Sequence, residues 1–238
     1  MTGLLAQVAA FLLALWAAPH LGVLWHALFP GLARPTWDSQ SWFALLGEHL
    51  LLSLGAALIA AAIGLGAGIL ATRGAGRSLR PLLDALFAFA QAIPPVAVIA
   101  LALPLLGFGA APTLLALVLY AALPVMRSAV AGLDAVPPAV LDAARGTGMG
   151  RAGILTRVEL PLALPVIQAG LRVAVVLSIA TTAVGAVAGA SCLGTPIIVG
   201  LANGNTAWVL QGAIFTAWLA LIADRALRLG LRQGATQP

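Results

Sequence analysis

The sequence predicts an all-α protein built as a bundle of six membrane-spanning helices, and three observations support this. Hydrophobic residues make up 62% of the 238 residues and charged residues only 8%, whereas globular domains are about half apolar and about a quarter charged. Six apolar stretches are long enough to cross a bilayer core, which takes about 20 residues per helix. The connections between them are short, so we expect one compact membrane domain.

The six predicted spans are Leu4–Phe29, Leu50–Thr72, Asp84–Leu106, Pro112–Val130, Leu162–Gly189 and Ile197–Leu227. The first of them could instead be a cleaved signal peptide, because Ala17-Ala18-Pro19 resembles a processing region. No basic residue precedes it, however, and its apolar run is longer than a usual signal core, which favours a retained helix.

Basic residues orient the spans, because arginine holds short loops on the cytoplasmic side of a membrane. All 12 basic residues are arginine, and only Arg34 lies in a connection on the opposite side. Both termini and the segment between the fourth and fifth spans are therefore predicted to be cytoplasmic. The pI of about 11.3 then reflects loop orientation rather than nucleic-acid binding. The arginines on the predicted cytoplasmic side are Arg73, Arg77, Arg80, Arg127, Arg145, Arg151, Arg157, Arg225, Arg228 and Arg232.

Several residues predict how the spans bend and pack. Pro94 and Pro95 interrupt the third span, since each proline removes a backbone donor and kinks a helix. The freed carbonyl groups must then find protein or water partners. Glycines four apart let two membrane helices approach closely, and charged residues four apart predict ion pairs at helix ends. The glycine pairs are Gly64 with Gly68 and Gly185 with Gly189, and the charged pairs are Arg80 with Asp84 and Asp224 with Arg228.

One polar segment lies between the fourth and fifth spans. It reads Asp142-Ala143-Ala144-Arg145-Gly146-Thr147-Gly148, followed after a gap by Val158-Glu159-Leu160-Pro161. Pro137 and Pro138 fit the first turn of a helix, so we expect a short helix to begin there, run through Ala144 and end at the glycines that follow. Its alanines leave a flat face that could enter a groove in a partner.

The charges and the exit of this segment lead to two further expectations. Asp142 is expected to complement the positive end of the short helix. The chain from Arg151 to Glu159 is predicted to continue as a helix along the membrane surface, with Pro161 at the turn into the fifth span. A tilt of the short helix would thus pass directly into that span.

The segment resembles the EAA loop of binding-protein-dependent ABC importer permeases. The family pattern is Glu-Ala-Ala, three residues, Gly, nine residues and Ile-x-Leu-Pro; here Asp142 replaces the glutamate and Val158 the isoleucine. The resemblance implies a cytoplasmic coupling helix through which motion passes from a separate ATPase. The residues to which it assigns this coupling are Leu141, Asp142, Ala143, Ala144, Gly148, Met149, Arg151 and Pro161.

The resemblance also implies an architecture and a set of partners. We expect an N-terminal membrane helix and outer loop in residues 1–41, followed by a permease transmembrane domain in residues 42–230 that holds the coupling loop at 134–161. That domain would contain a five-helix core in a bacterial plasma (inner) membrane, surrounded by lipid. The expected partners are ABC ATPase subunits, a second permease copy or a homologous permease, and a periplasmic or extracellular substrate-binding protein.

Three further stretches resemble the permeases of osmoprotectant importers, which carry glycine betaine, choline and related quaternary amines. They are Gln91–Val96, Val158–Ile167 and Gly194–Leu201. Amino acids or another small polar solute remain the alternative cargo, because the shared loop does not encode cargo. Arg172 could attract the carboxylate of a zwitterion, or it could have a structural role near the cytoplasmic boundary. The candidate residues along the substrate path are Gln91, Pro94, Pro95, Arg172, Ser178, Thr181, Thr182 and Asn203.

Other functions lack support in the sequence. The three histidines, His20, His26 and His49, are not spaced as metal ligands, and no Gly-x-Ser-x-Gly nucleophile motif occurs. The chain has no lysine, so it has no phosphate-binding loop. The lone Cys192 excludes an intrachain disulfide. We therefore expect no catalytic residue, no metal and no cofactor on this chain, with ATP bound by a partner. A channel or secondary transporter would not need the pattern from Asp142 to Pro161.

Overall fold

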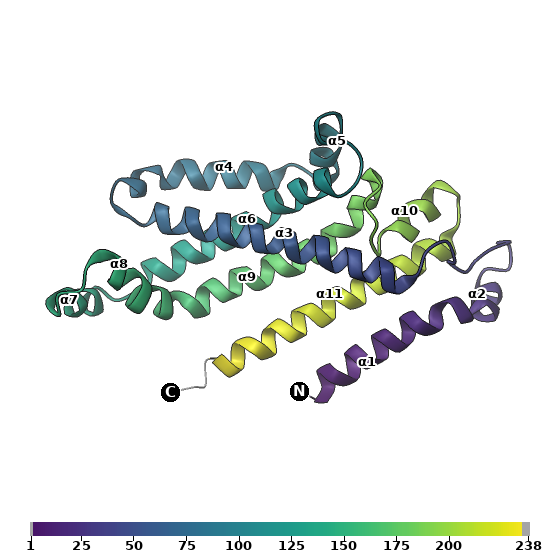
Figure 1. Cartoon of the computed structure of the whole chain (residues 1–238), viewed down its shortest axis with the longest axis horizontal. Coiled ribbons are helices and arrows are strands. Elements are labelled where there is room, and N and C mark those ends of the chain that lie inside the picture. Colours follow the sequence, from purple (N-terminus) through teal and green to yellow (C-terminus); the bar gives the residue numbers. More distant parts are fainter. Residues whose placement is uncertain (1, 235–238) are drawn as a thin grey trace.

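The computed structural model describes residues 2–234 and, within them, the side chains of residues 2–74 and 76–230. Every regular element in that part of the chain is helical (Figure 1). The long helices are α1 (Thr2–Ala17), α3 (Trp42–Ala71), α4 (Arg80–Ala92), α5 (Pro95–Leu106), α6 (Ala110–Asp134), α9 (Leu160–Thr182) and α11 (Thr206–Gly234). The short helices are α2 (Gly22–Leu28), α7 (Pro138–Gly146), α8 (Arg151–Ile154) and α10 (Thr195–Ala202). The remaining elements are the 3-10 helices η1 (Ala18–His20), η2 (Gly74–Leu79) and η4 (Ala183–Ala188), and the π turn η3 (Leu155–Glu159).

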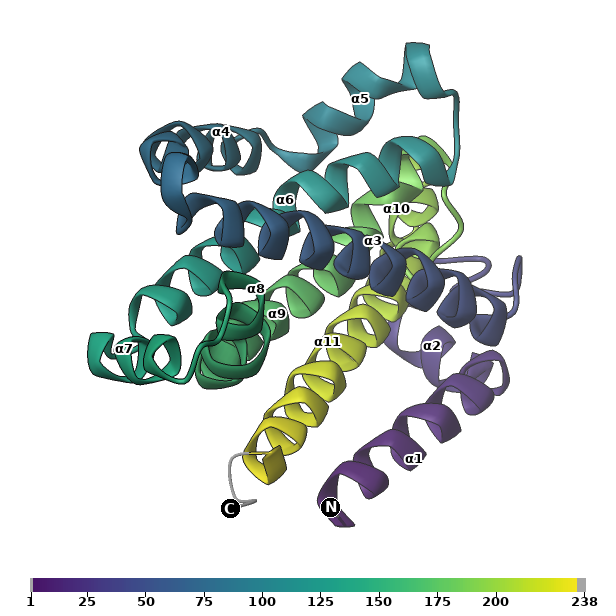
Figure 2. The same ribbon diagram turned by 60° about the vertical axis from the view of Figure 1, so that its left-hand side comes forward.

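Within the described residues, five helices are long and apolar enough to cross a membrane, and a sixth crossing is formed if α4 and α5 are taken as one broken span. This confirms the predicted six-span, all-helical bundle. The break lies at Pro94 and bends the pair by 89°, as expected where prolines remove backbone donors. Figure 2 shows α5 turned away from the direction of α4.

The boundaries of four predicted spans need correction. The first span ends near His20, and the second begins at Trp42 rather than Leu50. The fifth begins at Arg151 rather than Leu162, because residues 151–161 continue directly into the predicted span as one helix. Residues 195–202 form the separate helix α10, so the sixth span begins at Thr206. Gly204, whose φ of +65° only glycine adopts readily, makes the turn between α10 and α11.

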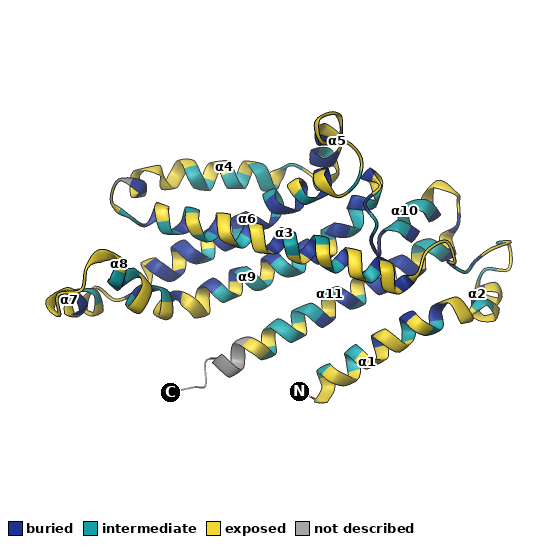
Figure 3. Ribbon diagram, viewed as in Figure 1, coloured by how far each residue is buried: buried dark blue, intermediate teal, exposed yellow. Residues whose placement is uncertain are grey.

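Helices α3, α6 and α9 form the centre of the bundle, and Figure 3 shows buried residues along all three. Their buried faces are rich in alanine and glycine. A Cβ atom placed on Gly64 would lie 2.6 Å from the carbonyl oxygen of Ala122, and one on Gly68 would lie 2.5 Å from Cβ of Ala129. This confirms that the first glycine pair allows close packing, here of α3 on α6. The second pair does not act as predicted: Gly185 touches Thr113, but Gly189 ends η4 with a φ of +79°.

The N-terminal helix and the loop after it are attached to the last span. Phe11 of α1 packs against Phe215 of α11 in a cluster that also holds Leu15 and Trp42. The loop is held by Gln211, whose Nε2 donates to the carbonyl oxygen of Pro35 at 2.7 Å. Figure 1 shows the N-terminus of α1 and the C-terminus of α11 at neighbouring ends of these two helices.

Candidate functional site

The short helix α7 begins and ends as the sequence predicts. Pro137 precedes it with extended backbone angles, and Pro138 is its first residue. At its end, Gly148 has a φ of +82°. The N–H of Gly148 donates to the carbonyl oxygen of Arg145 at 2.9 Å, and the N–H of Met149 donates to that of Ala144 at 3.3 Å. These two bonds form a Schellman motif, which satisfies the last carbonyl groups of a helix and favours glycine at its left-handed position.

The side chains of α7 divide into a buried edge and an exposed face. Ala144 is 7% exposed, whereas Asp142, Ala143 and Arg145 are exposed. Asp142 is the fifth residue of the helix, and the first turn holds no acidic residue. The expectation that Asp142 complements the positive helix end is therefore wrong, because that effect falls off within the first turn. Its carboxylate instead lies 2.6 Å from Nη1 of Arg145 on the same exposed face.

The exit from α7 also differs from the prediction. Residues 151–188 form one continuous helix, so Pro161 does not mark a turn into the fifth span. The backbone passes through the π turn η3, where the N–H of Leu160 donates to the carbonyl oxygen of Leu155, five residues earlier. Pro161 follows directly after this turn as the second residue of α9. It lies inside the continuous helix, where its lack of an N–H group removes one helical hydrogen bond. No loop therefore separates α8 from the membrane span, and the two move as parts of one helix.

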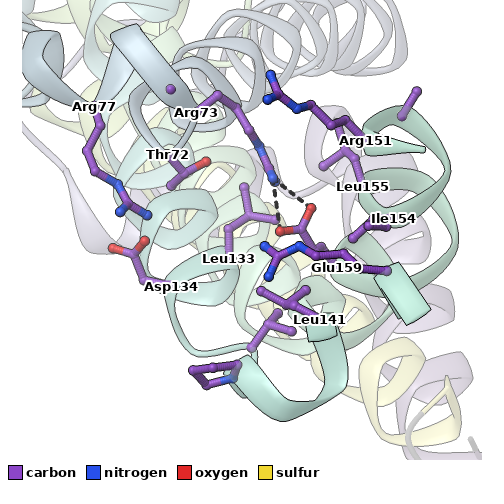
Figure 4. A pocket seen from close by; sticks show the side chains of 15 residues that line it. Thr72, Arg73, Arg77, Leu133, Asp134, Leu141, Arg151, Ile154, Leu155 and Glu159 are labelled. Carbon is purple, nitrogen blue, oxygen red and sulfur yellow. Dashed lines mark hydrogen bonds and ion pairs between the residues drawn. The ribbon is translucent and has the colours of Figure 1, made fainter. Parts of the chain in front are cut away.

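A cavity of about 770 Å³ lies beside α7 (Figure 4). Its walls come from the end of α3 and η2, the end of α6, α7 itself, and α8 with η3. Four arginines and two carboxylates line it, which gives its wall a net positive charge. These charged residues are Arg73, Arg77, Arg145, Arg151, Asp134 and Glu159.

An ion pair between the half-buried Arg73 and the buried Glu159 crosses this cavity. Nη1 of Arg73 lies 2.9 Å from Oε1 of Glu159 and 2.7 Å from Oε2, and Figure 4 shows both contacts as dashed lines. Glu159 is only 5% exposed. Sequence reasoning missed this pair, because it counted Arg73 only as an orienting charge and treated Glu159 only as part of Val-Glu-Leu-Pro. The available signal was that Glu159 is a lone acid next to an apolar span.

The N-terminal end of α4 and the C-terminal end of α6 carry two more ion pairs. The predicted pair of Arg80 with Asp84 does not form. Arg80 lies 2.6 Å from Asp134, and Asp84 lies 2.8 Å from Arg127. Both acceptors are reached across the helix interface, because α4 packs along α6. The predicted pair of Asp224 with Arg228 is confirmed at 2.9 Å.

The structure explains two of the candidate path residues by local contacts. Pro124 has no N–H group, so the carbonyl oxygen of Tyr120 lacks its usual helical donor. Nε2 of Gln91 supplies that donor at 3.0 Å. In the same way, Nε of Arg172 donates to Oδ1 of Asp224 at 2.8 Å, which agrees with the structural alternative for this arginine.

The other candidate path residues are spread over several elements. Ser178 and Thr182 are buried in α9, and the hydroxyl of Thr182 donates to the carbonyl oxygen of Ser178 at 2.7 Å. Thr181 is half-buried. Asn203 is exposed, with Nδ2 donating to Val199 at the end of α10. None of the eight candidates lines the cavity beside α7 or the two further cavities of about 450 Å³.

The remaining reactive groups are the candidate metal ligands and the single thiol. Among the described residues, no group of three or more His, Cys, Asp or Glu side chains could hold a metal ion. Cys192 is buried in the loop between η4 and α10, and its Sγ donates to the carbonyl oxygen of Thr182 at 3.4 Å. Burial raises the pKa of this thiol, which lowers its reactivity.

The match to known proteins covers most of the chain. Residues 64–230 match the family described as the binding-protein-dependent transport system inner membrane component. The chain belongs to this family. It is a multi-pass inner-membrane permease subunit of an ABC importer and not itself an enzyme. In this family the ATPase is a separate subunit, and the importer also includes a substrate-binding protein and a permease partner.

Several curated relatives are permeases as well. The permease is 40% identical over 207 residues to the glycine betaine/carnitine/choline transport system permease protein OpuCD of Bacillus subtilis, covering 85% of this chain and 89% of that protein. It is 41% identical over 179 residues to the choline transport system permease protein OpuBD of the same organism, covering 75% and 78%. It is 36% identical over 183 residues to the osmoprotectant import permease protein OsmY of Salmonella typhimurium, covering 76% and 78%.

Solved structures share the fold of the permease. A chain of the inward-facing MetNI methionine ABC transporter superposes with a TM-score of 0.70 at 21% identity, covering 83% of this chain and 99% of that chain. A chain of an amino acid ABC transporter crystallised with histidines gives 0.64 at 20% identity, covering 80% and 92%. At these identities the likeness shows the fold alone.

Proposed function

We propose that α7 is the helix through which this permease takes up motion from its ATPase. The observation that carries the proposal is the geometry of its end: Gly148 occupies the left-handed position of the Schellman motif, and it is the glycine that the family spacing from Asp142 requires. An exposed helix that presents a small side chain, Ala143, can enter a groove on the ATPase. The continuous helix from Arg151 onward then carries its displacement into the membrane.

The coupling residues divide into two roles under this proposal. Asp142 and Ala143, with the half-buried Leu141, would present α7 to the ATPase. Ala144, Gly148 and Met149 would hold the end of the helix in shape. Arg151 and Pro161 lie in the continuous helix that follows. A basic group of the ATPase would have to compete with Arg145 for the carboxylate of Asp142, because the two side chains lie 2.6 Å apart within this chain.

A docking experiment tests this role. Ala143→Trp places a bulky side chain on the exposed face of α7, and Ala85→Trp places the same side chain on an exposed position of α4. Both variants should reach the membrane normally. The ATPase should co-purify with the Ala85 variant and not with the Ala143 variant. Equal recovery of the ATPase with both would contradict the proposal.

The proposed orientation follows from the same role. If α7 meets a cytoplasmic ATPase, the arginine-rich turns after α3 and α6 are cytoplasmic too. Both termini then lie on the cytoplasmic side, since an even number of spans separates them. The loop of residues 29–41 and helix α10 would face the binding protein. Nucleotide would bind to the partner ATPase, with no cofactor held by this chain.

The proposed cargo is glycine betaine or a related quaternary amine. The support is that relatives at 36–41% identity carry names for glycine betaine, carnitine, choline or osmoprotectant transport. The decisive experiment is uptake of radiolabelled betaine, choline and methionine by cells that express the whole importer and lack other osmoprotectant uptake systems. Uptake of betaine or choline supports the proposal. Uptake of methionine alone would assign the permease to an amino acid importer instead.

The proposed substrate path narrows to four of the eight candidates. Gln91 and Arg172 are engaged by Tyr120 and Asp224, and Ser178 and Thr182 are enclosed within the chain. The remaining candidates are exposed or half-buried and can face a second permease across a shared path. They are Pro94, Pro95, Thr181 and Asn203.

A further inference from the structure

We propose that the ion pair between Arg73 and Glu159 is a second mechanical connection, which carries motion of the coupling segment into α3. This inference rests on the proposed coupling role of α7. The covalent chain already leads from α7 through α8 into α9. The ion pair adds a branch to a helix that lies far away in the sequence, and makes both residues positioning residues for transport.

The location of the pair gives it this role. Arg73 is the second residue after the end of α3, and Glu159 is the last residue of the π turn between α8 and α9. The cavity of about 770 Å³ separates the walls that carry them. In Figure 4 the two side chains extend toward each other across that space. A contact across a cavity transmits displacement between elements whose backbones are not packed together.

The environment makes the connection hard to break. The Glu159 side chain is only 7% exposed, and a buried carboxylate without a partner is strongly unfavourable. Nε and Nη2 of Arg73 are buried and have no hydrogen-bond partner among the described residues. Glu159 is thus the partner that holds this guanidinium through Nη1. If the π turn moves, Arg73 must follow or a buried charge is left unpaired.

The π turn explains why Glu159 faces the cavity. A π turn places one extra residue in the helix and shifts the face on which the following side chains lie. Thr156 and Arg157 within the turn are exposed, whereas Glu159 is buried. Turns of this kind occur frequently at functional sites. Here the irregular backbone lies at the junction where the cytoplasmic segment becomes a membrane span.

Helix α3 can pass the displacement onward. Gly64 and Gly68 bring α3 into backbone contact with α6, and interiors packed this closely transmit strain. Gly170 brings α9 equally close to α6, since a Cβ there would lie 2.6 Å from the carbonyl oxygen of Pro124. The coupling segment would therefore move the three central helices from two points, through α9 and through Arg73.

The test compares variants of this pair with a matched control pair. Glu159→Gln and Arg73→Gln remove one charge each, and the double variant Arg73→Glu with Glu159→Arg reverses both. The control variants Asp84→Asn and Arg127→Gln disrupt an exposed pair of similar length, 2.8 Å, between α4 and α6. Each permease is purified with its ATPase and binding protein and placed in liposomes, where solute uptake and ATP hydrolysis are measured together.

We expect the single variants of the proposed connection to hydrolyse ATP while transporting little. The number of ATP molecules hydrolysed per solute molecule transported should rise about tenfold, a factor within the usual range for coupling between two sites. The reversed pair should recover at least part of the wild-type ratio, and the control variants should keep it. A wild-type ratio in Glu159→Gln would overturn the inference. So would a parallel loss of uptake and hydrolysis together with lower thermal stability, because that pattern indicates a structural role alone.

The same liposomes separate this inference from the proposed function. If Gly148→Val loses uptake while Glu159→Gln keeps the wild-type ratio, α7 is the coupling helix and only the second connection fails. If bulky substitutions at Gly148 and Ala143 leave uptake unchanged, the coupling role of α7 itself fails.

Discussion

Replacing Gly148 tests the shape of the coupling helix directly. The φ of +82° at this position costs an L-amino acid about 1–2 kcal/mol. Apart from the adjacent residues, no atom of the described chain lies within 4 Å of the site where a Cβ would stand, so backbone strain is the main local penalty. One or two kcal/mol corresponds to a factor of about 5–30 in the ratio of two states. The ratio of permeases in which the end of α7 keeps this conformation to those in which it does not should fall by that factor.

The assay is uptake by the whole importer in a series of substitutions at Gly148. Asn tolerates the left-handed conformation, Ala does not, and a β-branched residue there is a marked outlier. Uptake should therefore fall in the order Gly, Asn, Ala, Val, with wild-type amounts of permease in the membrane, because α7 is exposed. Wild-type uptake by Gly148→Val would refute the reasoning. Equal damage by Asn and Val would also refute it.

Two substitutions and one labelling experiment test the fold further. Gln91→Leu removes the donor to the Tyr120 carbonyl, which should lower the free energy of unfolding by about 1–3 kcal/mol. Adding Pro124→Ala should restore thermal stability, because the new N–H group can pair with that carbonyl. A double variant that stays as unstable as Gln91→Leu would contradict the contact. Gly68→Leu should prevent α3 from packing on α6 and deplete the permease from membranes, an outcome that immunoblotting against Gly66→Leu as control would check. Burial and a raised pKa should keep Cys192 unmodified by maleimide at neutral pH until the permease is denatured, and rapid labelling of the native form, seen by mass spectrometry, would count against the structure.

The sequence predicted the order of the membrane-spanning helices well, because the length of an apolar run is a local property of the chain. It also predicted the start of α7 from Pro138 and its end from the following glycines. The start of α3 was placed too late, since Glu48 and His49 interrupt the apolar run. Continuity of α8 with α9 was missed because a π turn has no clear sequence signal and Pro161 suggested a turn.

The contacts of the charged residues were harder to predict. Arg73 and Glu159 are 86 positions apart, and no periodicity connects them. Arg80 and Asp84 have helical spacing, yet each finds a partner on α6. Spacing along one helix shows which pairs are possible, whereas tertiary packing decides which of them form.

The sidedness of Ala143 tests the central claim most directly. Ala143→Cys, made with Cys192→Ser so that no other thiol is present, is treated with a membrane-impermeant maleimide in right-side-out and inside-out vesicles. The account predicts labelling in inside-out vesicles only, and protection from the reagent when the ATPase is bound. Labelling from the outer side, or no protection by the ATPase, would contradict it.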